Sequence, residues 1–347
     1  MQALVYHGPN DLRLESSVPM PEPGPGEAVL DVGACGICGT DLRIAKGAHR
    51  AYKPGTVRIP GHEIAGTVVA AGPGTNLPEG QAAFIAPNIG CGHCAQCRAG
   101  RVNLCINPQA LGITLDGAFA EYVRLPAELI AQGNVMPVPN DVDFGALALV
   151  EPLAAVLRGS RACNIAAGDL VLISGAGPIG LLHLQVAKLH SPRAVVVSEP
   201  SDERRAQAAE WGADHVIDPL EEDLPGLIRE LSEGRGTDVI IIAAPAPQAQ
   251  EQAIELAAPG GRINFFGGLP KERSHITIDS NAIHYKELIV TGTTANTTED
   301  CKEALKLVME RKIDTGRIIS ERHPLSEAHE AFAAAASTKA LKVVIEP

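Results

Sequence analysis

The chain has 347 residues, of which 45% are hydrophobic and 20% are charged, and its formal net charge is −12. This length suits two domains that each bury a core. The acidic balance and an aromatic content of 3% argue against a nucleic-acid partner, which needs a basic face and stacking side chains. The first residues do not resemble a secretory signal, and no apolar run approaches the roughly 20 residues of a membrane span. We therefore expect a cytoplasmic protein without a membrane partner, whose eight cysteines are thiols rather than disulfides.

The N-terminal half has the pattern of a β-rich domain. Alternating apolar positions with frequent Gly and Pro breaks predict short strands joined by loops. A Pro- and Gly-rich loop is expected over 19–26. The strands expected from this pattern lie at residues 1–8, 28–32, 63–71, 81–86 and 118–123. Such spacing indicates a partly barrel-like domain.

A histidine beside a carboxylate, in Gly61-His62-Glu63, offers two metal ligands side by side. Together with Cys38 upstream and Glu151 downstream, the pair suggests a catalytic metal site. Each residue alone has another interpretation. Cys38 could be a buried thiol, with Cys35 as the alternative ligand. His62 could be a core histidine, and Glu151 an acid at a helix start. Neighbouring residues of a regular strand point to opposite faces, so both His62 and Glu63 reach one metal only if the backbone turns there. We therefore expect His62 to be the firm ligand and Glu63 the conditional one.

Four cysteines follow at the spacing C-x2-C-x2-C-x7-C within a short polar lobe, residues 90–106; they are Cys91, Cys94, Cys97 and Cys105. Close pairs allow thiolates to converge on one tetrahedral ion at about 2.3 Å. Such a closed site is structural, and its metal contributes on the order of 10 kcal/mol to folding. An iron–sulfur cluster is the main alternative, but the last spacing does not fit the ferredoxin pattern. A zinc ribbon that binds nucleic acid conflicts with the acidic balance. We therefore predict structural zinc.

The second half contains a dinucleotide-binding motif in its proper context. An apolar strand is expected over 169–174, followed at once by Gly175-Ala-Gly177-Pro178-Ile179-Gly180 and a helical pattern. The first glycine makes the turn, the second admits the pyrophosphate and the third lets the helix approach the strand. The helix N-terminus then faces the phosphates.

An acid ends the next predicted strand, 194–198, at Glu199. At this position a carboxylate binds a ribose 2′-hydroxyl and repels a 2′-phosphate, so NAD is favoured over NADP. Arg204 and Arg205 weaken this preference, because either could accept a phosphate. The alternative for Glu199 is a solvated charge at a strand end.

Strands and helices continue to alternate, which predicts a parallel, doubly wound sheet. Ser201 is expected to cap a helix that stops at Gly212. The remaining strands are expected at 215–218, 238–244, 262–266, 288–294 and 342–345, and the remaining helices at 248–258, 298–312 and 326–337.

These motifs together resemble those of the zinc-dependent medium-chain dehydrogenases, in particular the polyol (sorbitol-like) and threonine 3-dehydrogenase branches. The match spans nearly the whole length. The residues that carry it are Cys35–Asp41, Gly61-His62-Glu63, Cys91–Cys105, Asp116–Tyr122, Glu151-Pro152-Leu153, Gly175–Gly180 and Ser198-Glu199-Pro200.

The resemblance implies a GroES-like catalytic domain over 1–150, a Rossmann NAD-binding domain over 151–296 and a return to the catalytic domain over 297–347. It implies a structural zinc ion in the lobe. It also implies a catalytic zinc ion on Cys38, His62 and Glu63, with Glu151 as a ligand or as the partner of one. NAD is the implied cofactor, and a homodimer or homotetramer the implied assembly. The implied cofactor contacts are Gly175, Gly177, Pro178, Ile179, Gly180, Glu199 and Arg204 toward the adenosine and pyrophosphate, and Phe266, Gly267, Gly268, Thr293 and Thr294 toward the nicotinamide.

By the same resemblance the chain would oxidise a secondary alcohol of a polyol or sugar to a ketone, with Thr40 relaying the hydroxyl proton. L-threonine 3-dehydrogenase and an inactive nucleotide-binding relative are the alternatives. The chain departs from the family at Arg43, where many relatives carry histidine. Arginine stays protonated and cannot be the relay base. Arg43 would instead bind a carboxylate or phosphate of the substrate or cofactor, and His49 is a candidate replacement base.

Overall fold

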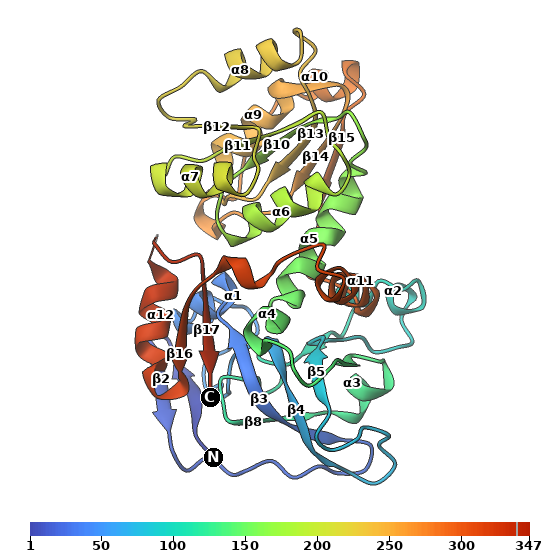
Figure 1. Ribbon diagram of the computed structural model, residues 1–347, viewed down its shortest axis with the longest axis vertical. Coiled ribbons are helices and arrows are strands. Elements are labelled where there is room, and N and C mark those ends of the chain that lie inside the picture. The colour runs from blue at the N-terminus through green and yellow to red at the C-terminus, as the bar shows by residue number, and fades with distance from the viewer. Residues whose placement is uncertain (338) are drawn as a thin grey trace. The chain divides into compact units, whose positions relative to one another are not determined.

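The computed structural model describes residues 1–337 and 339–347. Contacts within the chain divide it into two compact units (Figure 1). The first unit comprises Met1–Ala154 and Asn296–Pro347, and the second comprises Ala155–Ala295. Helix α5 (Val150–Cys163) runs through the first of these divisions.

The first unit is built around a seven-stranded sheet whose main order is β16-β17-β3-β4-β5-β9, with β8 paired to β3. All neighbours are antiparallel except β16 and β17. Two small hairpin-like pairs, β1-β2 and β6-β7, lie outside it. The strands are β1 (Ala3–Gly8), β2 (Asp11–Glu15), β3 (Ala28–Gly36), β4 (Glu63–Ala71), β5 (Ala82–Ile85), β6 (Asn88–Ile89), β7 (Gln109–Ala110), β8 (Tyr122–Leu125), β9 (Val135–Pro137), β16 (Ile319–Pro324) and β17 (Lys342–Glu346).

The strand predicted over 118–123 is wrong in its position, since β8 begins only at Tyr122. The backbone N–H groups of Gly117, Ala118 and Phe119 donate instead to the carbonyls of residues 59–61. This short segment therefore supports the turn before β4 rather than extending a strand.

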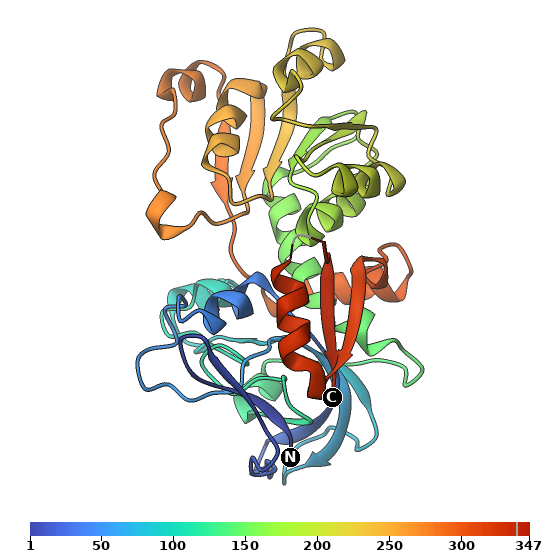
Figure 2. The same ribbon diagram turned by 90° about the vertical axis from the view of Figure 1, so that its left-hand side faces the viewer.

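The C-terminal residues complete the first sheet. Strand β17 pairs antiparallel with β3, with Val344 opposite Gly36 and Ile345 opposite Cys35. Figure 2 shows these red strands beside the blue strands of the N-terminal region. The apolar core of this unit draws on both segments of the chain, because Phe332 and Ile345 belong to the same cluster as Leu4 and Ile64.

Helices of the first unit are short. Thr297 caps α11 through a reciprocal pair of hydrogen bonds with Asp300, which explains why that helix begins where the sequence predicts. The helices are α1 (Gly39–Ala45), α2 (Ala95–Arg98), α3 (Ala127–Ala131), α4 (Phe144–Ala148), α11 (Thr298–Met309) and α12 (Ala328–Ala336), with 3-10 turns at Val102–Leu104, Gly316–Ile318 and Leu325–Glu327.

The second unit is a six-stranded parallel sheet in the order β12-β11-β10-β13-β14-β15, which confirms the predicted doubly wound fold. Helices cover both faces, with α6 and α7 on one side and α9 and α10 on the other (Figures 1 and 2). Every residue of β10 is buried, as expected for a strand covered on both faces. The elements are β10 (Leu170–Ser174), α6 (Pro178–Lys188), β11 (Ala194–Ser198), α7 (Asp202–Glu210), β12 (His215–Ile217), α8 (Leu224–Leu231), β13 (Thr237–Ile242), α9 (Pro247–Leu256), β14 (Ala257–Phe265), a 3-10 turn (Lys271–Arg273), α10 (Ser280–Tyr285) and β15 (Ile289–Gly292).

Among the residues that the structure describes, no helix has the length and apolar character needed to span a membrane.

Candidate active site

A glycine turn sets the direction of the chain at His62. Gly61 has φ of +100°, and a Cβ there would lie 2.8 Å from the sulfur of Cys35 and 2.8 Å from the backbone nitrogen of Phe119. Only glycine fits this conformation without strain. His62 precedes the strand, and Glu63 is the first residue of β4. The two side chains are therefore free of the alternation that a regular strand would impose.

Cys38, His62 and Glu63 converge in space. Their sulfur, nitrogen and oxygen ligand atoms all lie within 4.8 Å of one another. His62 is 8% exposed and Glu63 is 0% exposed, and Oε2 of Glu63 has no hydrogen-bond partner among the described residues. A buried carboxylate oxygen without a partner is costly, so its surroundings suit a bound cation. A set of sulfur, nitrogen and oxygen donors with one position open fits a catalytic zinc ion.

A second glycine makes room for the Glu63 carboxylate. Gly36 lies opposite Glu63 in the pairing of β3 with β4, and a Cβ on Gly36 would stand 2.0 Å from Oε2 of Glu63. Any larger residue at this position would displace the carboxylate.

Asp41 contacts both the backbone of Cys38 and the imidazole of His62. It is 0% exposed, and its Oδ2 accepts a hydrogen bond of 2.9 Å from the backbone N–H of Cys38, which caps α1. Its Oδ1 lies 3.4 Å from Nδ1 of His62. Burial lowers the pKa of His62, but Asp41 and Cys38 outweigh it, so that pKa lies well above its usual value. The surroundings of this imidazole are therefore strongly negative and attract a cation.

A buried lysine from the last strand contacts the same carboxylate. Nζ of Lys342 lies 2.6 Å from Oε1 of Glu63, and the side chains are 7% and 0% exposed. Burial lowers the pKa of Lys342, but the charges of Glu63 and Cys38 raise it by a larger amount. The pKa therefore lies above its usual value, and the ammonium is retained. Lys342 thus occupies one oxygen of Glu63 and leaves Oε2 for another cation. Sequence reasoning missed this residue, although a lysine inside the apolar run of 342–345 was a visible signal.

Glu151 lies near this group without belonging to it. Its Oε1 accepts a hydrogen bond of 2.7 Å from Nδ2 of Asn296, which also donates to the Glu151 carbonyl. Nδ2 of Asn88 donates in turn to Oδ1 of Asn296 at 2.8 Å. Burial raises the pKa of Glu151, and the charge of His62 lowers it. The two asparagines, which the sequence analysis missed, hold this carboxylate beside the group.

Thr40 and Arg43 lie on one face of α1. Nη2 of Arg43 donates to Oγ1 of Thr40 at 3.1 Å. His49 follows in the next loop, half-buried, with its Nδ1 3.3 Å from the backbone nitrogen of Ala51. Burial, followed by the charges of Arg43, Arg50 and His62, lowers the pKa of His49, which favours the neutral form of the imidazole. A neutral imidazole can accept a proton, as the predicted replacement base requires.

The four lobe cysteines also converge, with all sulfur atoms within 4.8 Å of one another. Cys91 and Cys97 are 4.0 Å apart, as are Cys94 and Cys105. Tetrahedral Zn–S bonds of about 2.3 Å place sulfurs about 3.8 Å apart, so the cluster fits zinc. Backbone N–H groups of Cys97 and Ile106 lower the pKa of Cys94 to about 6, which favours a thiolate ligand.

The glycine-rich loop has the geometry that its motif requires. Gly175 has φ of +102°, and Gly177 caps the N-terminus of α6. A Cβ on Gly180 would lie 1.9 Å from the carbonyl oxygen of Gly175, so the helix meets the strand closely. Oε2 of Glu199 accepts a hydrogen bond of 2.8 Å from the backbone N–H of Ala176. Glu199 therefore lies against the loop rather than in solvent.

The two arginines of α7 have different surroundings. Arg205 donates to the Glu199 carbonyl and forms ion pairs with Asp202 and Asp218. Nη1 of Arg204 lies 4.0 Å from the position of a Cβ on Gly177, beside the glycine-rich loop. Arg204 is therefore the better placed of the two for a phosphate.

The residues predicted for the nicotinamide follow β14 and β15, whose carboxyl ends lie at the same sheet edge as the glycine-rich loop. Gly267 donates to the carbonyl of Ile242, and Oγ1 of Thr293 lies 3.3 Å from Oδ1 of Asn264. The ring of Phe266 meets the buried His183 edge to face, with centroids 4.8 Å apart. Gly268 has nothing within 4 Å of an added Cβ, so its surroundings are open. Ligands of such sheets bind at this edge.

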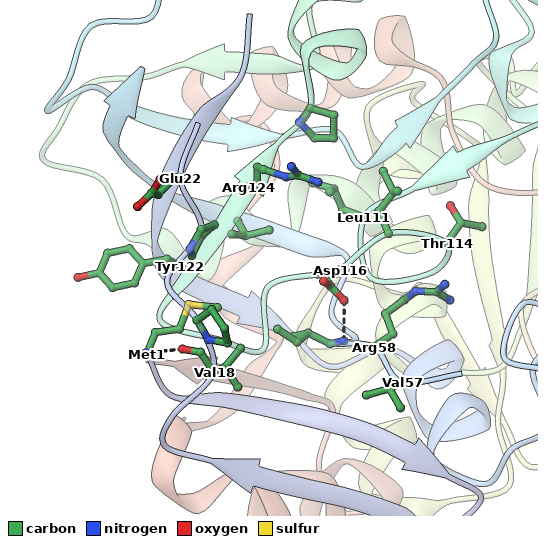
Figure 3. A pocket seen from close by; sticks show the side chains of 17 residues that line it. Met1, Val18, Glu22, Val57, Arg58, Leu111, Thr114, Asp116, Tyr122 and Arg124 are labelled. Carbon is green, nitrogen blue, oxygen red and sulfur yellow. Dashed lines mark hydrogen bonds between the residues drawn. The ribbon is translucent and has the colours of Figure 1, made fainter. Parts of the chain in front are cut away.

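A separate cavity of about 480 Å³ lies in the first unit (Figure 3). Two of its charged groups have partners: Asp116 accepts from the backbone nitrogen of Ile59 at 3.0 Å, and Arg58 donates to the Ile113 carbonyl at 2.9 Å. None of the candidate zinc ligands lines it. This cavity is therefore separate from the Cys38–His62–Glu63 group.

Comparison with known proteins agrees with this architecture. The protein-family model described as "Alcohol dehydrogenase GroES-like domain" matches residues 24–140 of this chain, and the family model described as "Zinc-binding dehydrogenase" matches residues 178–310. L-threonine 3-dehydrogenase of Thermococcus kodakarensis is 38% identical over 95% of this chain and 93% of its own. Sorbitol dehydrogenase of Halalkalibacterium halodurans is 32% identical over 100% of this chain and 99% of its own.

Among solved structures, a zinc-binding dehydrogenase from Sinorhizobium meliloti 1021 bound to NADP superimposes with a TM-score of 0.92 at 35% identity, covering 100% of this chain and 99% of that one. The chain belongs to the zinc-dependent medium-chain dehydrogenase family. It is an oxidoreductase of the class that uses zinc and a nicotinamide dinucleotide.

Proposed function

We propose that this dehydrogenase oxidises a secondary alcohol of a polyol or sugar to a ketone, with zinc at the Cys38–His62–Glu63 group and NAD as the hydride acceptor. The observation that carries the proposal is the buried set of three different donors, with Oε2 of Glu63 unpartnered in a space that Gly36 keeps free. Zinc held there would supply Lewis-acid polarisation of the hydroxyl oxygen.

Around the Cys38–His62–Glu63 group, neighbouring side chains orient the three ligands and balance their charges. Asp41 faces Nδ1 of His62, which turns the other ring nitrogen toward Cys38. Lys342 holds one oxygen of Glu63. Asn296 holds Glu151 nearby as a ligand or as the partner of one.

We propose that Thr40 relays the proton of the substrate hydroxyl. Its Oγ1 accepts a hydrogen bond from Arg43 with one lone pair, so the second lone pair can accept the substrate hydroxyl proton while the threonine's own hydrogen passes onward. The hydroxyl proton would leave through Thr40 to His49 or water, and NAD held by the second unit would supply the acceptor for the hydride of the carbinol carbon. The products are a ketone, NADH and a proton, so the reaction balances.

NAD is proposed over NADP because the Glu199 carboxylate stands at the end of β11 beside the glycine-rich loop. Arg204 near Gly177 argues in the other direction, as does NADP in the related structure from Sinorhizobium meliloti 1021. Phe266, Gly267, Gly268, Thr293 and Thr294 are proposed to contact the nicotinamide, and Pro178 and Ile179 the pyrophosphate and adenosine.

L-threonine is the second candidate substrate, favoured by the 38% identity to a threonine 3-dehydrogenase. A screen of polyols, sugars and L-threonine with NAD and NADP, followed by nicotinamide absorbance, tests both. Cys38→Ser should abolish turnover, whereas Cys163→Ser, which changes a buried thiol outside both cysteine groups, should not. Absence of turnover with every compound in the zinc-loaded protein would overturn the proposal.

We also propose a homo-oligomer in the cytoplasm. Strand β15 lies at the edge of its sheet with Ile289 exposed, next to an exposed Tyr285, and such an edge favours pairing with a second copy. All eight cysteines are free thiols, which suits a reducing compartment. Light scattering would test the assembly.

A further inference from the structure

A basic segment adjoins the candidate zinc group in this acidic chain. From Leu42 to His62 the sequence has five Lys and Arg residues and no Asp or Glu, although the whole chain carries −12. Arg58 is engaged with the Tyr52 ring and the Ile113 carbonyl. In the described part of the chain, Arg43, Lys46, Arg50 and Lys53 have no carboxylate partner, and all four are exposed. The positive charge of this segment is therefore not balanced from within.

One of these cations, Arg43, lies on the helix that Cys38 caps. Cys38 caps α1, and Thr40 and Arg43, three residues apart, share one face of that helix, where they are hydrogen-bonded. Arg43 therefore follows the thiol of Cys38 by five residues, within the same short helix.

The loop after α1 is anchored rather than loose. The N–H of Ala48 donates to the Arg43 carbonyl at 2.8 Å, and the N–H of Tyr52 donates to the His49 carbonyl at 3.0 Å. The hydroxyl of Tyr52 donates to the carbonyl of Gly112 at 2.8 Å. These contacts fix the turn that carries Arg50, next to His49.

The electrostatic surroundings of His49 agree with this placement. The charges of Arg43 and Arg50 both lower the pKa of His49, and so does that of His62. The two arginines therefore act within range of one imidazole that also senses the candidate zinc ligand.

A purely solvated surface is the simplest alternative. Solvated charged faces usually mix both signs, whereas here one sign occupies the whole segment. Arg43 also uses a single N–H group on Thr40, so the rest of its planar fork remains available. Guanidinium forks match carboxylates and phosphates in a bidentate manner.

We propose that Arg43 and Arg50 form an anion subsite beside the Cys38–His62–Glu63 group, and that the substrate is a hydroxylated anion. The expected compounds are polyols or sugars that carry a carboxylate or a phosphate apart from the reacting hydroxyl. The segment offers no carboxylate to an ammonium group, so a net anion is favoured over a zwitterionic amino acid. This inference rests on the proposed dehydrogenase function.

The test compares matched compounds on the zinc-loaded enzyme with NAD: sorbitol, a six-carbon aldonate, sorbitol 6-phosphate and L-threonine. We expect kcat/KM to be at least about 10-fold higher for an anion than for sorbitol. Arg43→Gln and Arg50→Gln should each raise KM for the anion about 10- to 100-fold, the range of a lost charged hydrogen bond. Arg43→Lys should recover part of the loss. Lys53→Gln, an exposed cation of the same segment, should change KM by less than about twofold.

A binding measurement separates this inference from the proposed function. The aldonate, sorbitol 6-phosphate, acetate and inorganic phosphate are titrated into the enzyme–NADH complex, and NADH fluorescence is followed. Stronger binding of acetate or of phosphate identifies the carboxylate or the phosphate as the recognised group.

Each possible outcome supports or overturns the dehydrogenase proposal or the anion subsite. Anion binding that depends on Arg43, without turnover of any alcohol, overturns the dehydrogenase proposal and supports the subsite. Equal turnover of sorbitol and the anions, unaffected by Arg43→Gln, overturns the subsite and supports the dehydrogenase. If Arg43→Gln raises only the KM for NAD, Arg43 binds the cofactor pyrophosphate, and the proposal of an anion subsite is overturned. A preference for L-threonine overturns the net-anion assignment.

Discussion

The buried ion pair between Lys342 and Glu63 leads to a quantitative prediction for the metal-free protein. The atoms are 2.6 Å apart, and the side chains are 7% and 0% exposed. Lys342→Met keeps the apolar stem and removes the ammonium, which leaves a buried carboxylate without a cation. Removing one partner of a buried pair costs roughly 3–5 kcal/mol.

Thermal unfolding of the metal-stripped protein measures this cost. At roughly 2–4 °C per kcal/mol for a unit of this size, the Tm of Lys342→Met should fall by roughly 6–20 °C. The matched control is Lys302→Met, because Lys302 also lies 2.6 Å from a carboxylate, that of Glu299, but the two are 51% and 77% exposed. An exposed pair contributes at most about 1 kcal/mol. Equal shifts for the two variants would refute the reasoning.

The same variants report on the metal. Zinc bound by Glu63 supplies the positive charge that Lys342→Met removes, so the difference in Tm should shrink when zinc is restored. If the difference is the same with and without zinc, Glu63 does not bind the metal.

Three further predictions follow from single contacts. Burial lowers the pKa of His183 to about 3, below its unfolded value of about 6.5, so stability is present above pH 6.5 and is lost as pH falls toward 3. Between pH 8 and pH 5 the wild type should lose about 2 kcal/mol more than His183→Leu, measured as the change of Tm with pH; parallel curves would contradict this. Asn296→Ala leaves the Glu151 carboxylate unpaired and should cost about 1–3 kcal/mol in denaturant unfolding, and an unchanged midpoint would show that water replaces the amide. Cys105→Ser should lower zinc content from about two to about one ion per chain, measured by atomic absorption, while Cys163→Ser keeps both.

Local patterns predicted much of the fold. The limits of β4 and β11 agree with the predicted strands at 63–71 and 194–198, because each is an apolar run bounded by turn residues. Helix α5 was missed, since Pro152 and Gly159 interrupt its pattern. Its glycine has a packing reason: a Cβ on Gly159 would lie 2.8 Å from the Phe266 ring. Tertiary contact, not propensity, decides that position.

The candidate site was predictable only where its residues are close in sequence or form a known motif. The lobe cysteines and Gly61-His62-Glu63 belong to this group. Lys342 and Asn296 do not, because their partners Glu63 and Glu151 are 279 and 145 positions away. Contacts of that separation depend on how β17 and α11 return to the first unit, which no local pattern specifies.

The discontinuity of the first unit has a consequence for biosynthesis. The second unit, Ala155–Ala295, is one continuous segment and can fold as soon as it has been synthesised, whereas β3 must wait for β17 at the end of the chain. At roughly 5–20 residues per second, that delay is roughly 15–60 s. Until β17 has been synthesised and has paired with β3, Glu63 therefore lacks the cation of Lys342. We expect the Cys38–His62–Glu63 group to reach its final charge balance only after this pairing, later than the second unit folds.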